Sequence, residues 1–209
     1  LADCLGFKNK RYDALLDQYE PGMTTSTLNK LFSDLKSELL PLVEGLSQKV
    51  NAVDDKVLHQ HYPAEKQLEF GLKMAKLIGY DLSRGRQDQS VHPFCTSFSI
   101  NDVRITTRLD EKFLSSALFG TLHECGHALY EQGINIEFER TLLGGGTSLG
   151  IHESQSRLWE NLVGRSREFW KFAYPILKTF FQDSLDECSL ETFYRSINRV
   201  QPSLIRVEA

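Results

Sequence analysis

The spacing of apolar residues along the chain predicts a mostly helical protein. From Thr25 onward, apolar side chains recur every three or four residues, the spacing that places them on one face of a helix. These residues are Leu28, Phe32, Leu35 and Leu39. We expect this helix to end ahead of Pro41 and to pack its apolar face into the core. Such a stripe can also line a ligand-binding groove, which is the rarer use of the pattern.

A second helix is predicted after Pro63, because proline is favoured at the first position of a helix. Phe70, Met74 and Leu77 are expected on its buried face, and Gly79 marks its end.

Strand composition occurs at two places, residues 91–98 and 102–108. In the second segment polar and largely apolar side chains alternate, so one face of the strand is polar. The polar set is Asp102, Arg104 and Thr106, and the other set is Val103, Ile105 and Thr107. The polar face can be solvated or can line a cleft, and periodicity does not distinguish the two. Residues 81–90 are polar and are expected to form a loop.

The longest predicted helix runs from Glu111 to Gln132, because Asp110 can cap its start and Gly133 its end. Shorter helices are expected at 13–19, at 150–168, at 169–181 with an interruption at Pro175, and from a cap at Ser189 to about Val200. No internal repeat or linker divides the sequence, so we expect residues 1–209 to belong to one domain.

The composition is that of an ordinary globular protein, with 41% hydrophobic and 25% charged residues. A net charge of -4 argues against nucleic acid or an anionic membrane as the main partner. No apolar run is long enough to span a membrane, and the sequence does not start with a secretory signal pattern. The four cysteines are far apart and form no C-x-x-C pair, which favours reduced thiols in a cytoplasmic protein.

The candidate chemistry is concentrated in the segment His123-Glu124-Cys125-Gly126-His127, an H-E-x-x-H pattern inside the longest predicted helix. Residues four apart lie on one face of a helix, so His123 and His127 can point at one ion. Two imidazoles form half of a zinc site, and Glu124 can flank the metal and handle a proton. Cys125 faces elsewhere on the helix and is expected to pack.

A catalytic zinc needs a third protein ligand. The downstream candidates are Glu131, Glu137, Glu139, Glu153 and Glu160. Glu131 continues the row of the two histidines but lies too far along the helix to converge on the same ion, so we expect it to be solvated. Glu153 can return beside His127 if the next helix runs back along the first, and Glu160 would then lie deeper. Geometry alone leaves this choice open.

The sequence resembles the carboxypeptidase Taq family of zinc metallopeptidases. Three segments occur in the order of that family's signature motifs: 102–106 (DVRIT), 123–127 (HECGH) and 152–155 (HESQ). Residues 92–94 (HPF) are similar to a segment that precedes the strand in these enzymes, and 205–209 (IRVEA) resemble the start of their I-R-x-x-A-D motif. The resemblance extends from about residue 25 to the end of the chain.

The resemblance implies a mostly α, zincin-like fold of the neurolysin and angiotensin-converting-enzyme type, with a small β-sheet beside the active-site helix and a deep cleft. It implies a homodimeric metallocarboxypeptidase of about five hundred residues that removes C-terminal residues from peptides with a free carboxylate. His123, His127 and Glu153 become the Zn²⁺ ligands, with Co²⁺ as a possible substitute, and Glu124 becomes the general base. Arg206 is the candidate for holding the substrate's terminal carboxylate.

Three further residues are candidate substrate contacts. His92 comes from the H-P-F segment, and His152 precedes the third ligand, where a supporting or core role is an equal alternative. Arg104 is expected to pair with Asp102 and to shape the cleft wall.

The chain begins without methionine and ends without a closing turn, so we expect an internal fragment of a longer protein. The family's later G-x-x-Q-D-x-H-W motif is absent from this sequence, so we expect the fragment to be inactive or nearly so. Two alternatives stay open: another zinc peptidase, endopeptidase or aminopeptidase, and a non-catalytic helical module that binds zinc. Glu124 argues against the second, because a structural zinc site needs no base.

Overall fold

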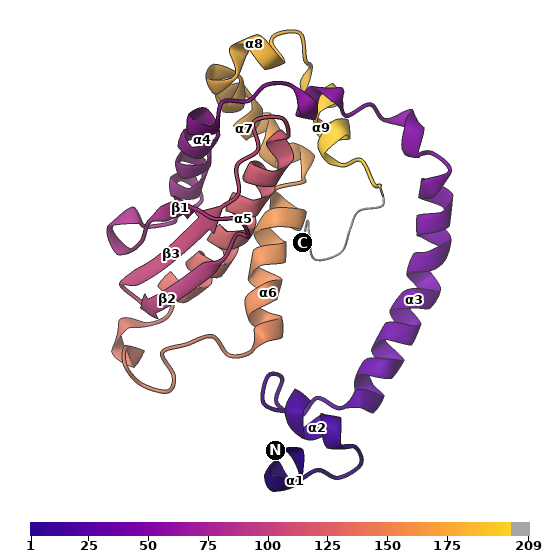
Figure 1. Cartoon of the computed structure of the whole chain (residues 1–209), viewed down its shortest axis with the longest axis vertical. Coiled ribbons are helices and arrows are strands. Elements are labelled where there is room, and N and C mark those ends of the chain that lie inside the picture. Colours follow the sequence, from indigo (N-terminus) through magenta and orange to yellow (C-terminus); the bar gives the residue numbers. More distant parts are fainter. Residues whose placement is uncertain (202–209) are drawn as a thin grey trace.

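The computed structural model describes residues 1–201 as a mostly helical chain with one small sheet (Figure 1), as predicted. The α-helices are α1 (Ala2–Leu5), α2 (Arg11–Leu16), α3 (Thr25–Ser47), α4 (Ala64–Leu77), α5 (Leu114–Gln132), α6 (Leu149–Arg157), α7 (Arg167–Phe180), α8 (Gln182–Leu185) and α9 (Leu190–Ile197). The strands are β1 (Gln87–Gln89), β2 (Cys95–Ser99) and β3 (Asp102–Thr107). A π-helical segment, Leu158–Val163, follows α6 directly, and single 3-10 turns are found at Val50–Ala52, Lys56–His59, Leu82–Arg84 and Ile136–Phe138.

The sheet has the order β1-β3-β2, with β1 parallel and β2 antiparallel to β3. On β3 the predicted alternation is confirmed from Asp102 to Ile105, since Val103 and Ile105 are fully buried and Arg104 is exposed. It is wrong for Thr106, which was expected on the polar face but is buried and hydrogen-bonded to Ser90 and the Phe94 backbone N–H. Strand β1 was predicted as loop. Its sequence is Gln-Asp-Gln, which has no apolar residue. Backbone pairing with β3 defines the strand, so the hydrophobic pattern of the sequence does not predict it.

Helix α5 lies at the centre of the described structure, in contact with β3, α4 and α6. Its face toward the sheet buries Cys125 and Ala128 against Val103 and Ile105. The expected packing role of Cys125 is therefore confirmed. The helix begins at Leu114, later than predicted, because Asp110 accepts a hydrogen bond from the Lys112 backbone N–H in a separate turn.

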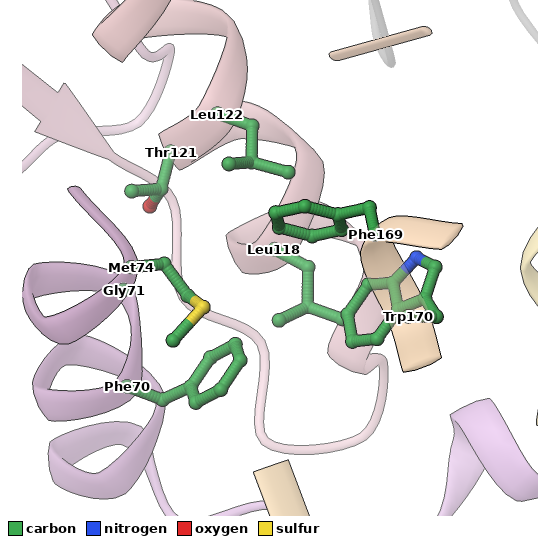
Figure 2. A pocket seen from close by; sticks show the side chains of 8 residues that line it. All are labelled: Phe70, Gly71, Met74, Leu118, Thr121, Leu122, Phe169 and Trp170. Atoms are coloured by element: carbon green, nitrogen blue, oxygen red, sulfur yellow. The ribbon is translucent and has the colours of Figure 1, made fainter. Parts of the chain in front are cut away.

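The main core lies between α4, α5 and α7 (Figure 2). Phe70 and Met74 of α4 contribute to it as predicted, but Leu77 is 51% exposed, and its expected burial is wrong. A gap of only about 10 Å³ lies among the apolar side chains there, which has room for one water molecule at most. This region is packed core. Helix α7 continues through Pro175, so the predicted interruption is wrong.

Helix α3 differs most from its prediction. It continues through Pro41 to Ser47, because one proline removes a hydrogen bond without ending a long helix here. No residue of α3 is buried, and Phe32 is 57% exposed, so the predicted packing of its apolar face into the core is wrong for the described residues. Figure 1 shows α3 standing away from α5 and the sheet.

The remaining predicted helices are found with altered bounds. Helix α2 starts and ends earlier than 13–19, and the pattern at 150–168 divides into α6 and the π-helical segment. Ser189 accepts a hydrogen bond from the Thr192 backbone N–H at 3.0 Å, so its predicted role as the cap of α9 is confirmed. None of the described helices is both long and apolar enough to cross a membrane.

Candidate metal centre

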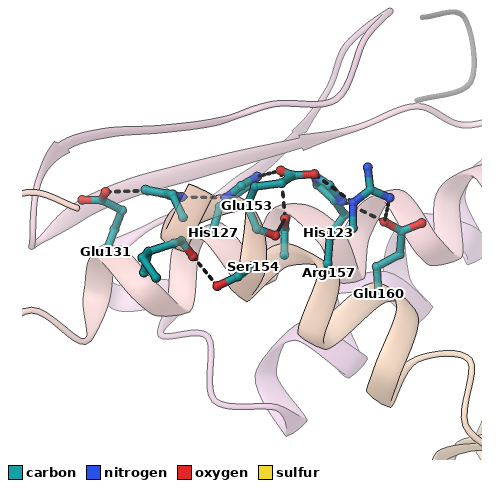
Figure 3. Close-up of polar contacts among 10 residues, drawn as sticks. His123, His127, Glu131, Glu153, Ser154, Arg157 and Glu160 are labelled. Atoms are coloured by element: carbon teal, nitrogen blue, oxygen red, sulfur yellow. Dashed lines mark hydrogen bonds and ion pairs between the residues drawn. The ribbon is translucent and has the colours of Figure 1, made fainter. Parts of the chain in front are cut away.

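The two histidines of the H-E-x-x-H segment lie one turn apart on α5, on the side that faces α6. Their rings meet edge to face, with centroids 5.0 Å apart, and both side chains are mostly buried. Figure 3 shows His123 and His127 pointing toward the same carboxylate, that of Glu153 on α6.

Glu153 completes a three-residue donor set. Its Oε2 lies 3.6 Å from Nε2 of His123 and 3.4 Å from Nε2 of His127. The three ligand atoms all lie within 4.8 Å of one another. Ligands placed tetrahedrally at about 2.0–2.2 Å from a metal are about 3.3–3.6 Å apart. The spacing therefore fits one tetrahedral metal ion, and two imidazoles with one carboxylate are a suitable donor set.

The Glu153 carboxylate is oriented by its own helix. Arg157 donates from Nε to Oε1 at 2.8 Å, and the Ser156 hydroxyl donates to Oε2 at 3.1 Å. Burial tends to raise the pKa of Glu153, but His123, Ser156 and Arg157 together hold this pKa below its usual value. The carboxylate is thus kept ionised with Oε2 directed at the histidines.

His123 is held from its far side. Its Nδ1 lies 2.8 Å from Oε2 of Glu160, which comes from the π-helical segment and is also bonded by Arg157. Burial tends to lower the pKa of His123, and the hydrogen bond with Glu160 and the neighbouring carboxylates outweigh it and raise this pKa. Of the downstream glutamates left open by the sequence, Glu160 therefore contacts His123 from the side away from Glu153, while Glu139 is bonded elsewhere, to the Ile100 backbone N–H.

His127 has a different neighbour. Its Nδ1 lies 2.6 Å from Nδ1 of His152, whose Nε2 lies 2.7 Å from Oε1 of Glu131. Glu131 is only 9% exposed, so the prediction that it is solvated is wrong. The regular spacing of His123, His127 and Glu131 on one face of α5 was the only sequence feature that pointed to a role for Glu131. Glu131 is not part of the donor group that His123, His127 and Glu153 form, and His152 from α6 lies between Glu131 and His127.

Glu124 is 6% exposed and lines a cavity together with His123. Burial raises the pKa of Glu124 to about 7; the charge of His123 acts in the opposite direction, and Glu153 and Glu160 add to the rise. For His127, burial and the neighbouring histidines lower the pKa to about 4, so this imidazole is neutral at pH 7 and able to bind a cation.

The cavity has a volume of about 690 Å³, large enough for part of a peptide. His92 lies in its lining, as do Arg157 and Arg165. Arg104 is not among the described residues that line it. Instead Arg104 forms the expected ion pair with Asp102, with both hydrogen bonds 2.7 Å long, on the exposed face of β3.

Arg206 lies outside the described residues, so its predicted contact with a terminal carboxylate has no structural description here.

Helical metallopeptidases have this arrangement: two histidines lie one turn apart on a helix, a buried glutamate lies beside them, and the next helix supplies a carboxylate. The family model described as "Carboxypeptidase Taq (M32) metallopeptidase" matches residues 1–209, and the chain belongs to this family. This confirms the resemblance seen in the sequence.

The similarity extends to characterised relatives and to a solved structure. The chain is 50% identical to thermostable carboxypeptidase 1 of Thermus thermophilus over 95% of its length, and 45% identical to carboxypeptidase 1 of Bacillus subtilis over 98%. It covers 39% and 41% of those proteins, so it spans about two fifths of the length of the curated relatives it matches. The carboxypeptidase structure from Deinococcus radiodurans R1 matches with a TM-score of 0.92 at 44% identity, covering 97% of this chain and 40% of that one. The predicted fold class is thereby confirmed.

Proposed function

We propose that this chain carries the metal-binding part of a zinc-dependent carboxypeptidase that hydrolyses the C-terminal peptide bond of peptides. The observation that carries the proposal is the convergence of His123, His127 and Glu153, whose ligand atoms lie within 4.8 Å of one another, with Oε2 of Glu153 3.6 and 3.4 Å from the two Nε2 atoms. Membership of a carboxypeptidase family supports the substrate class.

Zinc is the proposed ion because two imidazoles and one carboxylate in tetrahedral arrangement are a common catalytic zinc set. Mg²⁺ and Ca²⁺ favour sites made mainly of oxygen donors, which this set is not. Co²⁺ accepts the same donors and serves as a spectroscopic substitute.

Glu124 is the proposed general base. When bound, the metal would polarise the scissile carbonyl and acidify a water molecule. Glu124 would accept a proton from the attacking water and pass it to the leaving amine. Without the metal, burial raises the pKa of Glu124 to about 7, and the charge of a bound cation would lower it toward the ionised form that a base requires. Gln at this position keeps the size and loses the base, so Glu124→Gln is expected to retain metal and lose turnover by about 10²–10⁴-fold.

Binding of the free carboxylate makes the proposed enzyme an exopeptidase. Arg206 remains the proposed residue for this contact on the strength of the family motif, because a guanidinium offers two parallel donors to a carboxylate. His92 is proposed as a substrate contact from its place in the cavity lining. His152 has both ring nitrogens in hydrogen bonds within the protein, and Arg104 is paired through Nε and Nη2 with Asp102. The family also implies a homodimer, which light scattering of the native protein would test.

The test is a mass-spectrometric time course of the native protein with a set of peptides. We expect stepwise loss of C-terminal residues, no cleavage of the same peptides with amidated C-termini, and loss of activity with a chelator that Zn²⁺ restores. Internal fragments would favour an endopeptidase, and shortening from the N-terminus an aminopeptidase; either result would contradict the proposal. The 209-residue chain alone is expected to be inactive or nearly so in this assay.

A further inference from the structure

His152 is enclosed on several sides beside the candidate metal centre. Its two ring nitrogens lie 2.6 Å from Nδ1 of His127 and 2.7 Å from Oε1 of Glu131. Its side chain is 22% exposed. A substrate contact through either nitrogen would require breaking one of these hydrogen bonds.

We propose that Glu131 and His152 are positioning residues that fix the ring orientation and tautomer of His127, so that Nε2 of His127 faces the metal. The inference rests on the proposed function only in that His127 is taken as a ligand. It assigns to His152 a role other than substrate binding, and to Glu131 a role in place of solvation.

The directions of the two hydrogen bonds follow from the metal ligand. If Nε2 of His127 keeps its lone pair for the metal, then Nδ1 of His127 carries the hydrogen and donates it to His152. Nδ1 of His152 is then an acceptor, so the hydrogen of this ring is on Nε2 and is donated to Glu131. Each donor then has an acceptor, and the Glu131 carboxylate is the last acceptor in this series of hydrogen bonds. The opposite arrangement would place hydrogen on Nε2 of His127 and remove its capacity to bind the ion.

The packing around His152 holds the ring in this orientation. Tyr130 meets it edge to face, with ring centroids 5.1 Å apart. On another side lies Gly146, where an added Cβ would come within 2.8 Å of Cδ2 of His152 and 3.2 Å of the Tyr130 ring. The Thr147 backbone N–H donates to the Tyr130 hydroxyl at 3.1 Å, which ties this loop to α5. The ring therefore has little room to rotate away from His127.

The two histidine ligands are thus supported from opposite ends of the site. Nδ1 of His123 meets a carboxylate directly, that of Glu160. Nδ1 of His127 reaches its carboxylate through a second imidazole. Outer hydrogen-bond partners of metal-bound histidines typically contribute about 10–100-fold in metal affinity.

The test measures the zinc dissociation constant of the native protein by competition with a chromogenic chelator, and the visible absorption of its Co²⁺ form. The variants are His152→Ala, Glu131→Met and the double variant, with His61→Ala as a control at an exposed histidine. We expect His152→Ala to weaken zinc binding about 10–100-fold and to shift the Co²⁺ bands, and His61→Ala to do neither. Added imidazole is expected to return the Co²⁺ bands of His152→Ala toward those of the parent.

The double variant is the decisive comparison. Because Glu131 is proposed to act through His152, Glu131→Met, which removes the hydrogen-bond acceptor, should weaken binding in the parent and have no further effect when His152 is already alanine. Unchanged affinity in His152→Ala, or additive effects of the two substitutions, would overturn the inference. If His152→Ala does not fold by circular dichroism, Glu131→Met still decides, because Met has a similar length and no comparable acceptor; unchanged affinity and Co²⁺ bands would then overturn the inference. A native protein that binds zinc but cleaves no peptide would contradict the proposed function and leave this inference standing.

Discussion

Gly126 of α5 lies so close to Ser156 of α6 that a Cβ at position 126 would come within 2.5 Å of the Ser156 Cα. Such a distance is shorter than real Cβ contacts, so only glycine allows the two helices to meet here. Position 126 lies between the two histidines, and Glu153 lies one turn before Ser156. The close approach of the helices therefore brings the third donor to the first two.

Gly126→Ala should consequently disturb both stability and metal binding. The added methyl group must displace backbone atoms of α6, which typically costs about 1–3 kcal/mol and moves Glu153 away from the histidines. Chemical denaturation and chelator competition measure the two effects. Gly145→Ala is the matched control, because nothing lies within 4 Å of a Cβ at that position. Equal behaviour of the two variants would contradict the proposed role of the close contact.

Glu153 and Glu160 should differ in their effect on zinc affinity. Glu153→Ala removes a donor atom and is expected to weaken binding sharply, whereas Glu160→Gln removes only an outer charge and should weaken it by about 10–100-fold. Both changes are read from the same chelator competition. A larger effect from Glu160→Gln would indicate that Glu160 is the third ligand.

Glu124 should give the metal-free protein a pH-dependent stability. Its pKa is raised by burial from 4.5 to about 7 on folding, so the folded state binds its proton more tightly than the unfolded state does. This proton binding stabilises the folded state by about 3 kcal/mol below pH 4.5, and the stabilisation is lost as the pH rises through about 7. His127 has the opposite effect, because burial lowers its pKa from 6.5 to about 4. Its contribution to the stability of the folded state is present above pH 6.5 and is lost as the pH falls through about 4.

The comparison with Glu124→Gln separates these opposing effects. In the presence of a chelator, the free energy of unfolding of Glu124→Gln relative to the parent should rise by up to about 3 kcal/mol between pH 4.5 and 8. Urea titrations at several pH values measure it. A difference that stays constant with pH would contradict the raised pKa.

Cys95 and Cys125 should resist alkylation in the folded protein. Burial raises the pKa of Cys95 to about 12, with the charges of Glu124 and Glu131 adding to the effect, and burial also raises the pKa of Cys125. At pH 8 only about one Cys95 thiol in ten thousand would be the reactive thiolate. Exposed Cys4 is the internal control. Mass spectrometry after iodoacetamide treatment should find Cys4 modified, and Cys95 and Cys125 modified only in urea; labelling of Cys95 at the rate of Cys4 would contradict this.

The sequence was sufficient for the features that depend on local chemistry. The alternation on β3 from Asp102 to Ile105, the cap at Ser189 and the placement of both histidines on one helix face follow from side-chain spacing alone. Family resemblance predicts Glu153 as the third metal ligand. Residue spacing alone does not, because the distance between Glu153 and His127 depends on where α6 crosses α5.

Features that depend on tertiary contacts could not be predicted. The hydrogen bond between Glu131 and His152 depends on the crossing of α5 and α6. Gly126 allows that close crossing, but a glycine in the sequence does not by itself predict it. Strand β1 has no apolar pattern, because backbone pairing defines it. The periodicity of α3 correctly indicated a helix with one apolar face, but periodicity does not state what that face contacts.

The most direct test of the metal centre is an anomalous-scattering map at the zinc edge from crystals of the native protein grown with Zn²⁺. We expect a peak about 2.0–2.2 Å from Nε2 of His123, Nε2 of His127 and a carboxylate oxygen of Glu153. A peak bound to Glu160 or Glu131 in place of Glu153, or no peak between the two histidines at saturating zinc, would contradict the account.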